Sequence, residues 1–215
     1  MNALDLSQAT GARIDRAREN LEHIEAAMAA YEINTPERQA AFLAQIGHES
    51  GGLHWLIELW GPTSAQLRYE GRADLGNVHP GDGPWFKGHG PIQITGRTNH
   101  AACGRALGLD LLANPTLITT PRYGTASACW FWNSRQLSLL ADRDWFLAIT
   151  RAINGGFNGL ADRLRYWNRN RMVLGLAPVD TAGEAEAIKA FQRSHGLDAD
   201  GVVGPNTLRA LGGGR

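Results

Sequence analysis

The chain has 215 residues, of which 43% are hydrophobic and 20% are charged, and its 21 basic and 21 acidic side chains give a formal net charge of zero. This length holds one good-sized globular domain and a small second one, and zero net charge gives no electrostatic case for binding nucleic acid or membranes. No stretch approaches the roughly 20 apolar residues that span a bilayer, and the first six residues lack a basic region followed by an apolar run, so we expect no signal peptide.

Only two cysteines are present, Cys103 and Cys129. Two are too few for a disulfide framework, and we expect both to be reduced and buried. A Cys–His nucleophile pair is disfavoured because neither cysteine lies in a local catalytic signature.

Two helices are predicted near the start of the chain. Residues 11–31 place apolar side chains at alternating spacings of three and four, which predicts an amphipathic helix. Thr35 suits the N-cap position and Pro36 suits the first helical position, so a second helix should begin there.

The second helix carries the first candidate catalytic side chain. Phe42, Ile46 and Glu49 fall at i, i+4 and i+7, so the Glu49 carboxyl group shares the buried face of the helix. Gly51 and Gly52 should end the helix, because paired glycines lower helix stability and one of them can adopt the left-handed conformation of a C-terminal cap.

A second carboxylate, Glu58, follows nine residues after Glu49. In one continuous helix this separation is about 2.5 turns and about 13.5 Å of rise, so the two side chains would point to opposite sides. The glycine break instead allows the chain to turn and bring Glu58 back. We interpret the pair as the acid and base of a sugar-cleaving enzyme; the alternative is a helix end and a hydrated surface carboxylate.

Residues 61–90 are rich in Gly, Pro and Asp, which predicts turns and little regular structure. Long irregular segments of compact domains are often functional. Trp85 lies here, and an exposed indole can stack on a sugar ring, although most of the seven tryptophans should be core residues.

Residues 92–95 alternate between apolar and polar side chains after a glycine-proline turn. This pattern predicts a short strand whose polar face, Gln93 and Thr95, can bind a sugar or fix a water molecule. The alternative is an ordinary edge strand that faces solvent.

The rest of the chain is predicted to be helical apart from connectors. We expect helices over 98–112, 121–135, 145–153, 160–174, 184–195 and 205–211, a connector over 133–142 and a linker over 175–181. The helix over 160–174 carries a local basic patch, and one of its arginines could reach a substrate: Arg163, Arg165, Arg169 and Arg171. We place the domain boundary between residues 1–176 and 177–215.

Four blocks, in this order and combination, resemble glycoside hydrolase family 19, the chitinase-like fold of plant chitinases and many phage endolysins. The resemblance covers roughly residues 36–175 and implies a mainly α fold of α+β character, with a lysozyme-like two-lobed catalytic domain and a short β element. The blocks are FLAQIGHESGG at 42–52, GPIQIT at 90–95, residues 114–117 with Trp130-Phe131-Trp132, and residues 153–156 followed by Asp162-Arg163.

The same resemblance implies residue roles. Glu49 matches the general acid, Glu58 matches the general base of short-loop members, and Thr95 matches the Ser/Thr that helps to hold the attacking water. Six further side chains are expected to bind sugar or organise the carboxylates, the last four by the resemblance: His48, Trp85, Gln93, Asn99, Asn154 and Arg163.

Three positions depart from the family pattern. His89 stands where the family usually has Arg, and Thr98 and His100 replace aromatic residues of the chitinases. These departures weaken an assignment to chitin more than they weaken hydrolysis.

The tail, roughly 184–211, is similar to the second half of a peptidoglycan-binding domain of bacterial wall hydrolases. It implies a small helical wall-binding module. Together the two resemblances imply a phage endolysin of the muramidase type, which inverts configuration as it cleaves β-1,4 bonds of bacterial peptidoglycan. We expect a monomer without metal, cofactor, nucleic acid partner or stable membrane insertion, made in the host cytoplasm and acting on the cell wall in the periplasm after release.

Three alternatives remain. A chitinase acting on β-1,4-linked N-acetylglucosamine polymers is the second choice. A non-catalytic wall-binding protein is disfavoured because both carboxylates are present. A zinc amidase is disfavoured because His48-Glu49 is followed by His54 rather than by the histidine of H-E-x-x-H.

Overall fold

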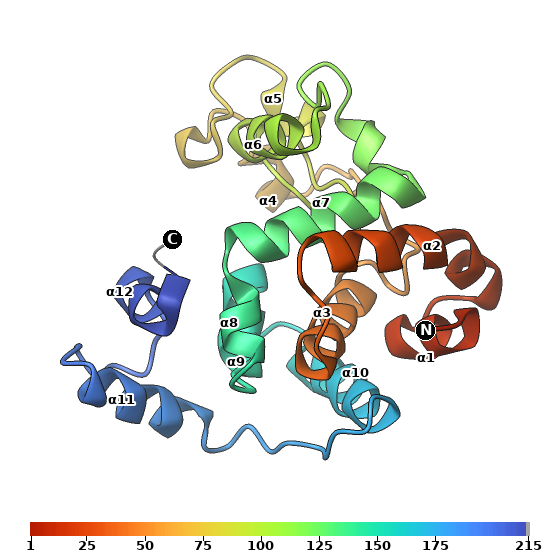
Figure 1. The fold of residues 1–215 in the computed structure, drawn as a ribbon. Coiled ribbons are helices and arrows are strands. Elements are labelled where there is room, and N and C mark those ends of the chain that lie inside the picture. The colour runs from red at the N-terminus through yellow and green to blue at the C-terminus, as the bar shows by residue number, and fades with distance from the viewer. Residues whose placement is uncertain (214–215) are drawn as a thin grey trace.

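The computed structural model describes residues 1–213 and is mainly helical (Figure 1). Within these residues, β structure is confined to two isolated antiparallel bridges, Ile57 with His89 and His89 with Ile94. The predicted mainly α fold is therefore confirmed. No helix in residues 1–213 is both long and apolar enough to cross a membrane.

The body and the tail contain the following elements, in chain order. The body has α1 (Ala3–Thr10), α2 (Ile14–Ala30), α3 (Pro36–Glu49), α4 (Ser64–Leu67), η1 (Ala73–Leu75), α5 (Asp82–Trp85), α6 (Arg97–Leu107), η2 (Pro115–Thr119), α7 (Pro121–Ser134), α8 (Leu137–Ala141), α9 (Phe146–Asn154) and α10 (Leu160–Val173). The tail has α11 (Glu184–Ser194), α12 (Pro205–Leu208) and η3 (Arg209–Gly213).

The body has two lobes. Figure 1 shows α4, α5 and α6 gathered at one end, with α7 and α2 crossing between them and the lobe of α3 and α10. Helix α3 is the central element of the second lobe: its residues from Ala40 to Gly47 are all buried, and it packs against α10 and α1. Phe42 also meets Trp132 of α7 edge to face, with 5.5 Å between ring centroids.

Helix α3 begins and ends as the sequence predicts. The Thr35 hydroxyl accepts a hydrogen bond from the Arg38 amide at 3.3 Å, which caps the N-terminus. The helix ends at Glu49, where Gly51 and Gly52 both adopt positive φ angles, +56° and +72°. The glycine break after Glu49 is thus confirmed.

Glycines also let the loop after α1 approach the end of α3 closely. A Cβ atom on Gly47 would lie 2.6 Å from the Thr10 carbonyl oxygen, and one on Gly52 would lie 2.6 Å from the Gly11 carbonyl oxygen. Backbone atoms cannot yield as a flexible side chain can. The N-terminal segment therefore fixes where α3 stops and where the chain turns toward Glu58.

We predict that Gly47→Ala destabilises the protein by about 1–3 kcal/mol, because the added methyl group overlaps backbone. Gly→Ala in a helix normally gains about 0.5–1 kcal/mol, so the sign of the change is the test. Urea unfolding measures it. Gly204→Ala is the control, because a Cβ there meets no atom within 4 Å; equal stability of the two variants would contradict the close approach.

Two local expectations are wrong, and one helix has no prediction. Residues 3–10, for which we make no prediction, form α1, whose N-terminus is closed by a capping box between Asn2 and Asp5. The predicted connector over 133–142 contains α8, whose apolar side chains Leu137 and Leu140 are buried. The predicted strand over 92–95 is absent, and Ile94 forms only an isolated bridge with His89.

The cysteines are as predicted. Both are free and buried, Cys103 on α6 and Cys129 on α7. Burial raises the pKa of Cys103 to about 12 and raises that of Cys129 as well. Both thiols are therefore inert at neutral pH.

The tail packs onto the body rather than hanging free. Figure 1 shows α11 and α12 beside α8 and α9. Ile188 and Leu211 belong to the same buried cluster as the core of the body. Phe191 of α11 meets Trp145 edge to face, with 5.7 Å between ring centroids. The linker over 175–181 connects the two parts without regular structure.

Candidate active site

Glu49 lies at the C-terminal end of α3 with its side chain 16% exposed. One of its oxygens, Oε1, is paired with the Arg163 guanidinium of α10. Arg163 is itself 1% exposed and also donates to the Gln45 side-chain oxygen at 2.5 Å. The Gln45 amide in turn donates to the Thr150 hydroxyl at 2.9 Å, so Glu49 ends a buried hydrogen-bonded chain.

His48 precedes Glu49 and is held by a second carboxylate. Its Nδ1 lies 2.7 Å from an oxygen of Asp162, which also pairs with Arg165. The ring lies directly over Gly159, where a Cβ would come within 2.2 Å of it. The structure therefore brings His48 beside Glu49 and fixes the orientation of its ring.

Glu58 is held by the other lobe. Its Oε2 accepts the Gly88 amide at 2.9 Å, and its Oε1 accepts the Gln66 amide at 3.0 Å and the Tyr69 hydroxyl at 3.4 Å. The Glu58 amide donates to the Gly88 carbonyl at 2.8 Å. Burial, and then the nearby Glu58 charge, raise the pKa of Tyr69. The two candidate carboxylates thus belong to opposite lobes.

The segment after Glu58's partner Gly88 is a turn and not the predicted strand. The Gln93 backbone N–H donates to the Gly90 carbonyl at 3.1 Å, and Gln93 adopts a φ of +56°. Such a conformation breaks the alternation of an extended strand. Only Ile94 remains paired, through two hydrogen bonds with His89.

The turn places Gln93 and Thr95 together, but both bind backbone. The Gln93 side-chain amide donates to the backbone carbonyls of Gly90 at 2.9 Å and Trp55 at 3.2 Å. The Thr95 hydroxyl donates to the Gln93 carbonyl at 3.0 Å, which leaves its oxygen free to accept. Asn99 of α6 donates to the Thr95 carbonyl at 2.7 Å and so ties Thr95 to that helix.

Two exposed tryptophans are candidates for stacking on sugar. Trp85 is 51% exposed and donates from its indole to the Leu112 carbonyl at 3.1 Å. Trp55 is 49% exposed and lies on the segment that joins Glu49 to Glu58. Trp55 is therefore the better placed of the two for a substrate that spans both carboxylates.

Asn154 is the last residue of α9, and Gly155 caps that helix in the left-handed conformation. The side-chain oxygen of Asn154 is buried without a hydrogen-bond partner in residues 1–213. An unpaired buried acceptor is uncommon in folded proteins, and no hydrogen bond among the described residues links this oxygen to Glu49 or Glu58.

The four arginines of α10 do not form one solvated basic patch, although one of them, Arg163, reaches Glu49. Arg163 and Arg171 are 1% and 5% exposed, and three of the four arginines pair with carboxylates of the body. The pairs are Arg163 with Glu49, Arg165 with Asp162, and Arg171 with Asp144. Arg163 and Arg171 are buried in their ion pairs, whereas the Arg165 side chain is 72% exposed, and Arg163 is the one of the four that pairs with Glu49.

Several partners were missed at the sequence level. Gln45 lies one helical turn before Glu49, so the i, i+4 spacing was a usable signal. Trp55 had a signal too, since it lies between the carboxylates in sequence. Gln66 completes the capping box of α4 with Thr63, which is a signal for the helix and not for a contact with Glu58. Tyr69 lies in a turn without a periodic pattern.

Two departures from the family pattern contact each other. The His89 Nδ1 lies 3.2 Å from the His100 Nε2, and the His100 Nδ1 lies 2.9 Å from the Gly96 carbonyl. Because the Gly96 carbonyl can only accept, His100 carries its proton on Nδ1 and His89 donates to it. Burial lowers the pKa of each histidine to about 4. The neutral pair anchors the 88–95 turn to α6.

We predict that this pair makes stability fall in mild acid. Both rings are neutral in the folded protein down to about pH 4, whereas unfolded histidine takes a proton near pH 6.5. The unfolded state thus binds more protons between these values, and the free energy of unfolding falls as pH falls, by on the order of 3 kcal/mol for each histidine.

Urea unfolding between pH 7 and pH 4.5 measures this slope. Glu184 acts in the opposite direction, because burial raises its pKa to about 7, so the comparison must be between variants. His100→Gln should give a shallower slope than the wild type, and His23→Gln on the less buried face of α2 should not. Parallel slopes for all three proteins would contradict a neutral buried pair.

The family model described as chitinase class I, glycoside hydrolase family 19, matches residues 22–144, which is more than half of the chain. The chain belongs to glycoside hydrolase family 19. The matched residues include Glu49, Glu58 and Thr95 and end before Asn154 and Arg163.

Relatives and solved structures agree with this family 19 assignment. An endochitinase of Solanum tuberosum is 32% identical over 185 residues, covering 69% of this chain and 56% of that protein. An endochitinase of Arabidopsis thaliana is 38% identical over 130 residues, covering 60% of this chain and 43% of that protein. The chain spans about half the length of the curated relatives it matches.

The fold of this family 19 protein is shared with bacterial chitinases. Chitinase C from Streptomyces griseus HUT6037 superposes with a TM-score of 0.66 at 25% identity, over 83% of this chain and 78% of that chain. A bacterial family 19 chitinase superposes with a TM-score of 0.67 at 25% identity, over 83% of this chain and 97% of that chain. The lysozyme-like expectation is thereby confirmed.

The tail of this family 19 protein matches a second model. Residues 182–211 match a putative peptidoglycan binding domain. The match covers α11, α12 and most of η3. The predicted similarity of the tail to wall-binding modules is confirmed.

Proposed function

We propose that this family 19 protein hydrolyses β-1,4 glycosidic bonds of bacterial peptidoglycan with inversion at the anomeric carbon. Glu49 is the general acid, and Glu58 is the general base. Thr95 helps to hold the attacking water. The observation that carries the proposal is the pairing of a family 19 body, which holds one carboxylate in each lobe, with a segment that matches peptidoglycan-binding domains.

The chemistry balances with these groups alone. Glu49 gives a proton to the glycosidic oxygen as the bond from that oxygen to the anomeric carbon breaks. A water oxygen attacks the anomeric carbon from the opposite face and loses a proton to Glu58. The inverting route needs the two carboxyl groups about 6.5–9.5 Å apart so that this water fits, and that separation stays a prediction.

The surroundings of the two groups support these roles. Arg163 binds only Oε1 of Glu49, and Oε2 has no hydrogen-bond partner in the described part of the chain, so it is the oxygen that can present the proton. Glu58 is held through both oxygens by donors from its own lobe. Both carboxylates are thus oriented before substrate arrives, which suits acid–base catalysis.

Peptidoglycan breakdown by such a protein fits an endolysin that lyses its bacterial host. In this proposal the protein is made in the host cytoplasm and reaches the wall after a separate membrane lesion. The tail keeps the enzyme at the wall, and no metal or cofactor takes part in the reaction.

Mass spectrometry of products tests the proposal. Purified peptidoglycan is digested and reduced with borohydride, and the new reducing ends are identified. N-acetylmuramic acid at these ends supports the muramidase assignment. Reducing N-acetylglucosamine alone would move the cleavage to the other glycosidic bond, and an absence of new ends would overturn the hydrolase proposal.

Chitin is the second candidate substrate, because the curated relatives named above are endochitinases. Chitin oligomers should be incubated with the same enzyme in parallel. Faster cleavage of chitin oligomers than of peptidoglycan would favour the chitinase assignment.

A further inference from the structure

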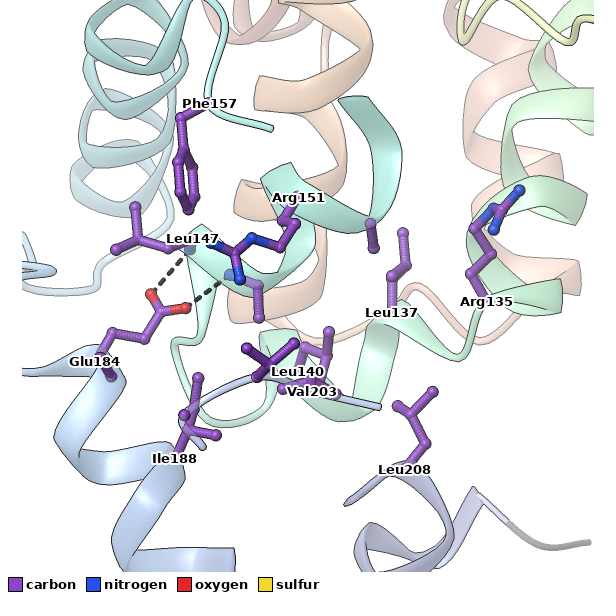
Figure 2. A pocket seen from close by; sticks show the side chains of 15 residues that line it. Arg135, Leu137, Leu140, Leu147, Arg151, Phe157, Glu184, Ile188, Val203 and Leu208 are labelled. Carbon is purple, nitrogen blue, oxygen red and sulfur yellow. Dashed lines mark hydrogen bonds between the residues drawn. The ribbon is translucent and has the colours of Figure 1, made fainter. Parts of the chain in front are cut away.

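The tail contributes a buried carboxylate to the body. Glu184, the first residue of α11, is 6% exposed. Its two oxygens accept the backbone amides of Leu147 at 2.8 Å and Ala148 at 2.7 Å, as the dashed lines in Figure 2 show. These amides lie in the first turn of α9, where helical N–H groups lack partners within the helix.

Helix α9 has no cap of its own. The side chain of its N-cap residue, Trp145, makes no capping hydrogen bond. A carboxylate at a helix N-terminus satisfies orphan amides and interacts favourably with the helix dipole. Glu184 therefore supplies, from the tail, the cap that local sequence does not provide.

The apolar contacts around this cap leave a gap. A pocket of about 180 Å³ lies between α8 and α9 on one side and the tail on the other. Figure 2 shows Glu184, Leu147, Ile188 and Val203 around it. Where side chains leave a gap, they fix the helix less firmly. The two hydrogen bonds of Glu184 consequently carry more of the positioning of the α9 N-terminus.

Helix α9 is connected to the candidate acid indirectly, through Gln45 and Arg163. Its buried Thr150 accepts the Gln45 amide at 2.9 Å, Gln45 accepts Arg163 at 2.5 Å, and Arg163 pairs with Glu49. Thr150 and Gln45 are both fully buried. A continuous series of contacts therefore runs from the tail to the candidate acid.

We propose that Glu184 is a positioning residue for Glu49. By capping α9 it holds Thr150, and through Gln45 and Arg163 it sets the orientation of the Glu49 carboxyl group. The tail is then a part of the catalytic unit as well as a wall-binding segment. This inference rests on the proposed function in so far as Glu49 is the acid.

Turnover by the full-length chain on soluble peptidoglycan fragments provides the first test. Glu184→Gln keeps the shape of the side chain but replaces one acceptor with an amide that faces the α9 N–H groups. We expect kcat to fall by about tenfold with KM within about twofold, because small misplacement of a catalytic group slows the chemical step. Glu186→Gln on the same helix is the matched control, since Glu186 is 69% exposed and pairs only with Lys189.

A double variant tests the route. Thr150→Val removes the hydroxyl that Gln45 binds. If the effects pass through the same contacts, Glu184→Gln combined with Thr150→Val should lower kcat no more than about tenfold, whereas independent effects would multiply to about a hundredfold. A multiplied effect would overturn the route through Thr150.

Two readouts do not depend on activity. Hydrogen exchange at the Leu147 and Ala148 amides should accelerate in Glu184→Gln and not in Glu186→Gln. The NMR signal of the Arg163 Nε–H should shift in the first variant only. If these exchange and NMR changes occur but the wild type is inactive, the proposed function is wrong and the positioning by Glu184 still holds. If the Arg163 signal does not move, or if the kcat of Glu184→Gln equals that of Glu186→Gln, the positioning role itself is wrong.

Discussion

Glu49→Gln is expected to lower turnover on purified peptidoglycan by about 10²–10⁴-fold, the usual contribution of a general acid. Glutamine has nearly the same shape as glutamate but carries no carboxylic proton to give to the leaving oxygen. Its side-chain oxygen can still accept the hydrogen bond from Arg163, which remains paired with Gln45. The fold should therefore be kept, and initial rates of reducing-end release measure the loss.

The control for this substitution is Glu19→Gln on the exposed face of α2. It makes the same chemical change far from both carboxylates in sequence and should leave the rate unchanged. Far-UV circular dichroism and the urea midpoint establish that both variants are folded. A folded Glu49→Gln protein with full activity would remove Glu49 from the mechanism.

Glu58→Ala is expected to cause a loss of similar size, about 10²–10⁴-fold, because water is no longer activated. The substitution also opens space beside the Gly88 amide, which donates a hydrogen bond to Glu58 in the wild type. Azide can enter such a space and attack the anomeric carbon without a general base, while Glu49 still protonates the leaving oxygen. The product is then a glycosyl azide of inverted configuration.

Rescue by azide distinguishes the role of Glu58 from that of Glu49. Azide should accelerate the Glu58→Ala variant and leave Glu49→Gln slow, because the latter still lacks a proton donor. Mass spectrometry detects the added azide, and NMR of the anomeric proton gives the configuration. A glycosyl azide of retained configuration would replace the inverting route by a two-step one.

The helices follow from local sequence, because periodic apolar positions and caps act over short distances. The bounds of α3 could be predicted from Thr35, Pro36 and the glycine pair. Helix α8 could not, because it is a short helix in a segment without a strong period, and its Leu137 and Leu140 are buried by distant elements. The strand over 92–95 failed because the positive φ of Gln93 turns a pattern of alternating side chains into a tight turn.

In the candidate site, too, local features could be predicted from the sequence and contacts between distant segments could not. Glu49 was visible because its position on the α3 face is a local property. Its partner Arg163 is 114 residues away, and the tertiary fold buries Arg163 and Arg171 of the predicted basic patch in ion pairs with Glu49 and Asp144. The donors to Glu58 are the side chains of Gln66 and Tyr69 and the backbone amide of Gly88, and no periodic pattern in the sequence places them beside Glu58.

The shared packing of Ile188 and Leu211 with the body has a practical consequence for protein engineering. A chimera that exchanges this segment for a foreign targeting module would strip an apolar cover from α8 and α9 and leave the α9 amides without an acceptor. Uncovered apolar surface of that kind promotes aggregation. A new specificity is therefore better fused beyond the segment than substituted for it.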